Sequence, residues 1–189
     1  MNFVTLLRNL AFATMAASLA MMAVTAPGRV SAASAARRQS AKPAACTAAP
    51  YRHFDFWAGD WDAFDYDKPA VAVARVRVNR ILDGCVLLED YQDTTGTKGQ
   101  SFSVYDETRG VWHQTWVTNR GRLLTIEGKL EGAEMILEGS DLTAEGKPRR
   151  IRGVWKPADG GVRETAVISM DGGGTWTPWF DLMFRPHKP

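Results

Sequence analysis

Three short stretches of alternating side chains follow one another in SFSVYDETRGVWHQTWVTNRGRLLTIEG, Ser101 to Gly128. In an extended strand, every second side chain lies on the same face, so such alternation is typical of β-structure. The links DETRG (106–110) and TNRG (118–121) carry Gly, Asn and Asp. These residues tolerate the backbone angles of tight hairpin turns. The stretch therefore predicts antiparallel strands over 100–106, 111–118 and 121–128.

The same pattern extends in both directions. Further strands are predicted at 60–66, 71–80, 84–92, 133–139, 149–156, 161–169 and 175–184. No connection is long enough for a helical crossover, so neighbouring strands should be antiparallel. We expect an all-β fold, an up-and-down barrel of about ten strands rather than a sandwich, because successive hairpins can close and leave no exposed edge. The segment YRHFDFW, 51–57, is predicted to form a short helical plug before the first strand.

The beginning of the chain differs from the rest. Arg8 precedes an uncharged run from Leu10 to Ala26, and small residues then permit cleavage after Ala26 or Ala33. This layout is typical of a secretory signal peptide, so 1–33 is predicted to be removed and the protein to be exported, to the periplasm or outside the cell. Residues 34–50, rich in Ala, Ser and Pro, are predicted to be a flexible leader. A single barrel domain, without a membrane span, is expected over 51–189.

Charge and cysteine content limit the possible partners. Without residues 1–33, the chain loses Arg8 and Arg29, so 23 basic residues become 21 against 21 acidic ones. This balance gives no reason to expect nucleic acid or an anionic membrane as a partner. A monomer that binds a small molecule is expected. Cys46 and Cys85 are predicted to form a disulfide, since paired cysteines are typical of exported chains. Two free thiols, or a lipid attached at Cys46, are the alternatives.

Several predicted strands place large aromatic and polar residues on one face. In VWHQTWV, one face carries Trp112, Gln114 and Trp116, and the other carries Val111, His113 and Thr115. In the predicted strand 84–92, Glu89 and Tyr91 share a face. A packed core would favour aliphatic residues, because a buried polar group needs a partner. A hollow barrel would supply water or a ligand as that partner. The predicted ligand-binding residues are Glu89, Tyr91, Tyr105, Trp112, Gln114, Trp116 and Trp155.

The segment GDW, Gly59 to Trp61, resembles the start of the calycin superfamily, the lipocalins and fatty-acid-binding-like barrels. The resemblance implies that Trp61 packs under an arginine of the last strand, for which Arg185 is the candidate. More widely, FDFWAGDWD, ILDGCVLLED, SFSVYDETRGVWHQTWV and SMDGGGTWTPWFD resemble a family of uncharacterised secreted bacterial proteins with an F-D-F-W-x-G-x-W-D start. That resemblance covers 53–185 and implies export and this fold. It supplies no catalytic residues.

Near the end of the chain, SMDGGGTW, Ser169 to Trp176, resembles the Asp-box hairpin of sialidases. The resemblance implies a structural turn in which Asp171 accepts backbone hydrogen bonds and Trp176 packs inside. Trp176, Phe180, Leu182 and Phe184 are expected on one face of the last strand, because their numbers share parity.

No catalytic motif is present, so a catalytic site is not predicted: G-x-S-x-G, a phosphate loop and H-E-x-x-H are all missing from the sequence. One alternative is a hydrolase or isomerase that uses Glu89, Glu127 and His113. Another is a structural or protein-interaction module of the cell envelope with a packed lumen. No metal is predicted at Asp60, Asp62, Asp65 and Asp67, because a calcium loop also needs a glycine and a closing Glu. No cofactor is predicted, and haem bound at His113 is the alternative.

Overall fold

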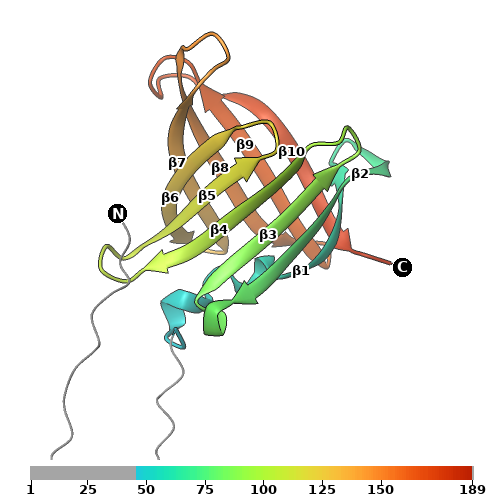
Figure 1. Ribbon diagram of the computed structural model, residues 1–189, viewed down its shortest axis with the longest axis vertical. Coiled ribbons are helices and arrows are strands. Elements are labelled where there is room, and N and C mark those ends of the chain that lie inside the picture. Colours follow the sequence, from blue (N-terminus) through green and yellow to red (C-terminus); the bar gives the residue numbers. More distant parts are fainter. Residues whose placement is uncertain (1–45, 189) are drawn as a thin grey trace, which may run out of the picture. The chain divides into compact units, whose positions relative to one another are not determined.

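A computed structural model describes residues 46–188 of the chain, and these residues form a closed barrel of ten antiparallel strands (Figure 1). Two 3-10 helices, η1 (Ala49–Arg52) and η2 (Asp55–Trp57), precede the barrel, and a third, η3 (Leu82–Gly84), connects β2 to β3. The strands are β1 (Gly59–Asp65), β2 (Lys68–Ile81), β3 (Val86–Asp93), β4 (Lys98–Asp106), β5 (Val111–Thr118), β6 (Leu123–Glu131), β7 (Glu134–Leu142), β8 (Pro148–Ala158), β9 (Gly161–Ser169) and β10 (Thr177–Pro186).

Each strand pairs with the next along the chain, and β10 pairs with β1 to close the barrel. The predicted fold class and all ten predicted strands are confirmed, with bounds that shift by a few residues. Alternation of buried and exposed residues runs along most strands, as in β4, where Gly99, Ser101 and Ser103 are buried and the residues between them are exposed. Among the residues described, 46–188, no helix has the length and apolar character needed to span a membrane.

The backbones of β6 and β7 approach each other closely. A Cβ atom at Gly128 would lie 1.9 Å from the carbonyl oxygen of Ile136, and one at Gly139 would lie 2.1 Å from that of Thr125. Real Cβ atoms do not come so near to another backbone. Glycine is therefore required at both positions to let this part of the wall form.

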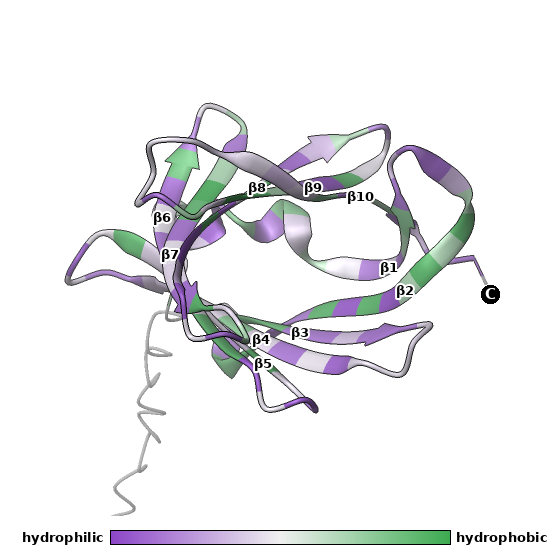
Figure 2. Ribbon diagram, turned by 90° about the horizontal axis from the view of Figure 1, so that it is seen from above, coloured by the Kyte–Doolittle hydropathy of each residue, from purple (hydrophilic) through white to green (hydrophobic). Residues whose placement is uncertain are grey.

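The segment that precedes β1 fills one end of the barrel, as the predicted plug should, and lies within the ring of strands in Figure 2. Phe54 is fully buried, and its ring packs edge-on against Trp112 and Trp155, with centroids 5.7 and 5.6 Å away. Trp57, 1% exposed, packs edge-on against Phe184 at 4.5 Å. These aromatic contacts close the end of the barrel at which β1 begins.

A disulfide between Cys46 and Cys85 confirms the predicted pairing, with the two Cα atoms 5.1 Å apart. It fastens the chain ahead of the plug to the connection between β2 and β3. The last residues of the predicted leader, 46–50, are thus attached to the barrel. The predicted signal peptide, 1–33, lies outside the described residues.

Arg185 does not lie over Trp61 as expected from the calycin resemblance. Asp62 is the residue opposite Arg185 in the pairing of β1 with β10, so Arg185 shares the outer face with Asp62. The neighbouring Trp61 points the other way, into the core. The guanidinium of Arg185 lies 5.0 Å from the centre of the Phe64 ring, while the Trp61 indole stacks on Trp57.

Trp176 also lies on the opposite face from the one expected. Pro178 pairs with Val167 and Phe180 with Ala166, which leaves Trp179 as an extra residue in β10. This β-bulge reverses the alternation, so Trp176 is outside although Phe180 faces the lumen. Trp176 lies under the guanidinium groups of Arg152 and Arg150, 4.4 and 5.6 Å from its ring centre.

The turn before β10 has the hydrogen bonds expected of an Asp-box hairpin. Asp171 Oδ1 accepts from Ser169 Oγ at 2.7 Å and from the Thr175 backbone N–H at 2.9 Å, and Oδ2 accepts from Thr175 Oγ1 at 2.7 Å. These bonds, led by that of the Thr175 N–H, hold the pKa of Asp171 well below its usual range. The carboxylate is fully occupied in shaping the turn.

Candidate ligand cavity

The barrel contains a cavity of about 930 Å³. Its lining includes residues from the turns β3–β4, β5–β6 and β7–β8, such as Thr97, Gly121 and Thr143. In an up-and-down barrel these turns lie at the end opposite the plug. The cavity therefore extends from the aromatic plug to an opening at the far end, which we call the mouth.

Aromatic and aliphatic side chains form most of the cavity wall. Trp116 from β5, Trp155 from β8 and Phe180 from β10 line it together with Tyr91. The Tyr91 ring packs edge-on against Trp116, with centroids 5.5 Å apart. The aliphatic part of the lining consists of Val73, Leu123, Leu124, Ile126, Leu142, Ile151 and Leu182.

A short series of polar side chains interrupts this wall on β3, β4 and β5. Ser101 donates a hydrogen bond to Glu89 Oε2 at 2.7 Å, and Gln114 Nε2 donates to Ser103 Oγ at 3.0 Å. Glu89 is only 9% exposed. Burial raises the pKa of Glu89 to about 7, with a smaller contribution from Asp90, although the Ser101 hydrogen bond opposes the shift.

Glu164 on β9 is a second carboxyl in the cavity, and we did not predict it from the sequence. It lies between Trp155 of β8 and Leu182 of β10 in the strand register. Protein atoms enclose it, although part of its surface remains open to the cavity. Burial raises its pKa well above the usual value, and the charge of Glu89 raises it further. Alternation in GVRETAVIS could have revealed it, because Val162, Glu164 and Ala166 share a face.

Within residues 46–188, the indole N–H of Trp155 has no hydrogen-bond partner, although Trp155 is only 4% exposed. The Trp155 indole favours the charged form of Glu164, but Nε1 does not reach an acceptor with hydrogen-bond geometry. Buried donors are nearly always paired with protein, water or ligand. Trp155 Nε1 is itself enclosed by protein atoms, as are the unpaired indole nitrogens of Trp57 and Trp112, so it does not mark a contact for a bound molecule.

A compact group of charged and aromatic side chains borders the mouth. Asp141 accepts two hydrogen bonds from Arg149, at 2.9 and 2.7 Å, and also pairs with Arg122. Both guanidinium groups lie against the ring of Trp179, 4.8 Å away for Arg149 and 5.5 Å for Arg122. Trp179, the bulged residue of β10, is 39% exposed. An aromatic ring held by two cations thus borders the way into the cavity.

Most of the predicted ligand-binding residues line the cavity: Glu89, Tyr91, Gln114, Trp116 and Trp155. Trp112 and Tyr105 do not. Trp112 is covered by Phe54, and Tyr105 packs against Tyr51 and Trp112, with centroids 5.2 and 6.1 Å away. Both lie at the plugged end of their strands. The plug fills the lumen at that depth, so neither residue reaches the cavity.

Two residues of the catalytic alternative, Glu127 and His113, lie on the outer face. Glu127 accepts hydrogen bonds from Arg109 at 2.9 and 2.8 Å, and His113 Nδ1 is 2.7 Å from Glu127 Oε1. His113 Nε2 is 2.8 Å from Thr115 Oγ1. Glu89 faces the lumen, so neither outer-face residue can share a catalytic site with it. His113 also does not face the cavity, as a haem ligand would have to.

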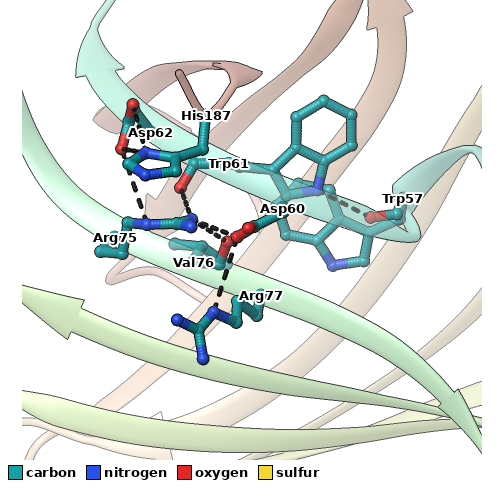
Figure 3. Close-up of polar contacts among 8 residues, drawn as sticks. All are labelled: Trp57, Asp60, Trp61, Asp62, Arg75, Val76, Arg77 and His187. Carbon is teal, nitrogen blue, oxygen red and sulfur yellow. Dashed lines mark hydrogen bonds and ion pairs between the residues drawn. The ribbon is translucent and has the colours of Figure 1, made fainter. Parts of the chain in front are cut away.

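Asp60 and Asp62 of β1 form ion pairs where β1, β2 and β10 meet (Figure 3). Arg75 pairs with Asp60 and donates to the carbonyl oxygen of Trp61 at 2.8 Å, and His187 Nδ1 lies 2.9 Å from Asp62. Over residues 46–188 there is no group of three His, Cys, Asp or Glu side chains that could hold a metal ion. The aspartates help to fasten the seam of the barrel.

No protein-family model matches the chain, and no curated protein matches it either.

Proposed function

We propose that the protein is exported and binds a small hydrophobic or amphipathic molecule inside its barrel. The observation that carries this proposal is the cavity of about 930 Å³, which falls within the range of 300–1,000 Å³ usual for small-molecule sites. Such sites combine apolar walls with a few polar groups, as Trp116, Tyr91 and Glu89 do here. The Cys46–Cys85 disulfide supports export, because disulfides persist in oxidising compartments.

Titration with N-phenyl-1-naphthylamine, an uncharged probe whose fluorescence rises in apolar surroundings, tests this proposal. The full chain should be secreted by a host and purified without reductant. We expect saturable binding of one probe per chain, and loss of at least about tenfold in affinity for Trp116→Ala, whose ring forms part of the wall.

Trp176→Ala is the matched control, because Trp176 is also a partly exposed tryptophan but lies on the outer face. It should bind the probe as the unchanged protein does. A protein that does not bind the probe at all, or an equal loss for both variants, would contradict binding in the lumen.

A hydrolase or isomerase is the second candidate function, and it is favoured by the two cavity carboxyls Glu89 and Glu164. Two carboxyls that face each other across a cavity and differ in proton affinity can act as acid and base. Their use here would replace the sequence-based set of Glu89, Glu127 and His113. Mass spectrometry of small molecules that copurify with the protein, before and after incubation, tests this candidate. Conversion by the unchanged protein but not by Glu89→Gln would support catalysis, and an unaltered ligand would support binding alone.

A further inference from the structure

We propose that the ligand carries a positively charged amine, which lies between the Glu89 and Glu164 carboxylates while its apolar part fills the remaining lumen. This inference rests on the proposed function and specifies the chemical class of the molecule bound.

The first argument is the unequal distribution of charge around the cavity. Its acidic residues are Asp65, Glu89, Asp93, Asp141 and Glu164, and its basic ones are Arg120 and Arg122. Arg122 is committed to Asp141 at the mouth, where Arg149 pairs with the same carboxylate. Arg120 donates to Thr97 Oγ1 at 3.1 Å in the turns of the mouth. No cation in the part of the chain that the structure describes pairs with Glu89 or Glu164.

The second argument is the incomplete set of contacts around the two carboxyls. Glu89 Oε2 accepts from Ser101, but within residues 46–188 no donor reaches Oε1. Glu164 faces Glu89 from the other side of the barrel, since β3 and β9 are well separated in the strand order. A carboxylate removed from water is costly without a partner, and two of them repel each other. A single bound cation would relieve both costs.

The third argument is the aromatic surface beside the carboxyls. Tyr91 and Trp116 lie edge to face on one wall, and Trp155 lies opposite Glu164 in the register of β8 and β9. Ammonium groups are attracted to the faces of aromatic rings, and most strongly where water is excluded. Aromatic rings combined with carboxylates are the chemistry that recognises organic cations.

An anionic head group would meet the opposite conditions in the same place. A fatty-acid carboxylate inside the lumen would add a third negative charge next to Glu89 and Glu164. The arginines that could attract it lie at the mouth, where Arg122 and Arg149 both pair with Asp141, and not beside Glu89 and Glu164. The cavity should therefore discriminate among molecules of equal length by the charge of the head group.

Displacement of bound N-phenyl-1-naphthylamine by decylamine, decanol and decanoate at pH 8 tests the inference. The three competitors share a chain length and differ in head group. Because hydrogen bonds to charged groups contribute about 1.5–3 kcal/mol, decylamine should displace the probe at concentrations at least about tenfold lower than decanol. Decanoate should be the weakest. Equal displacement by all three, or strongest displacement by decanoate, would overturn the inference.

Substitution of the two carboxyls identifies the groups responsible. Glu89→Gln and Glu164→Gln should each lower the preference for decylamine over decanol by about tenfold or more. Glu134→Gln is the control, because Glu134 pairs with Lys156 on the outer face and is 40% exposed. Unchanged binding of the fluorescent probe shows that each variant retains its cavity. A preference for the amine that survives in both glutamine variants would overturn the inference.

The dependence on pH gives a second readout. Affinity for decylamine should rise between about pH 5 and pH 8 as Glu89, whose pKa is about 7, ionises, whereas decanol affinity should stay level. The other titratable groups near Glu89 and Glu164 are Asp65, Asp90, Tyr91 and Asp93. If the unchanged protein fails to bind the probe, the proposed function fails; if it binds the probe without preferring the amine, only this inference fails.

Discussion

At the scale of single residues, Glu89 combines deep burial with a single side-chain hydrogen bond among the described residues, the one from Ser101. Folded Glu89 keeps its proton up to a pKa of about 7, whereas the unfolded chain releases it near the ordinary value of 4.5. Between these values the folded chain binds more protons than the unfolded one. The contribution of Glu89 to stability is therefore full below about pH 4.5 and is lost as the pH rises to 7.

Glu89→Gln should remove this loss, since a neutral amide can still accept the Ser101 hydrogen bond. We expect little change in the free energy of unfolding at pH 5. At pH 8 the variant should be more stable, by on the order of 2–3 kcal/mol at most. Urea unfolding of both proteins at the two pH values measures this difference. Glu134→Gln should show no such dependence, and a variant that is less stable at pH 8 would contradict the assignment.

At the scale of the strands, the sequence predicted each element because alternation and turn residues are local signals. The wrong predictions concern where a side chain lies relative to other strands or to the plug, which a local pattern does not encode. The bulge at Trp179 leaves no mark in the alternation, so Trp176 was expected inside. Trp112 and Trp116 share a face, yet only Trp116 lines the cavity, because the plug occupies the lumen at the depth of Trp112. The calycin resemblance misplaced Arg185, whose partner across the closure is Asp62.

The close contact between β6 and β7 gives a prediction at this scale. Gly128→Ala would place its Cβ 1.9 Å from the Ile136 carbonyl oxygen, so the two strands would have to separate. We expect a loss of about 1–3 kcal/mol in the free energy of unfolding, as found for overpacked positions. Thermal and urea unfolding measure the change. Lys129→Ala, at the next position but with a side chain 70% exposed, should have little effect.

At the scale of the whole molecule, the disulfide and the plug act together. The bond joins residues 39 apart and holds the segment that carries Phe54 and Trp57. Replacing both cysteines, as Cys46→Ala with Cys85→Ala, should lower the free energy of unfolding by about 2–4 kcal/mol, because the unfolded chain is no longer constrained. Reduction of the unchanged protein should give the same loss in urea unfolding. Equal stability of oxidised and reduced protein would contradict this role.

The plug also determines the end of the barrel at which a ligand can enter and leave the cavity. Phe54 and Trp57 obstruct one end of the barrel, so a ligand of the proposed kind would enter and leave at the mouth, which Trp179 borders. A ligand that enters with its charged group first would leave with its apolar part first. A membrane or protein that accepts the proposed ligand would then contact its apolar part before its charged group.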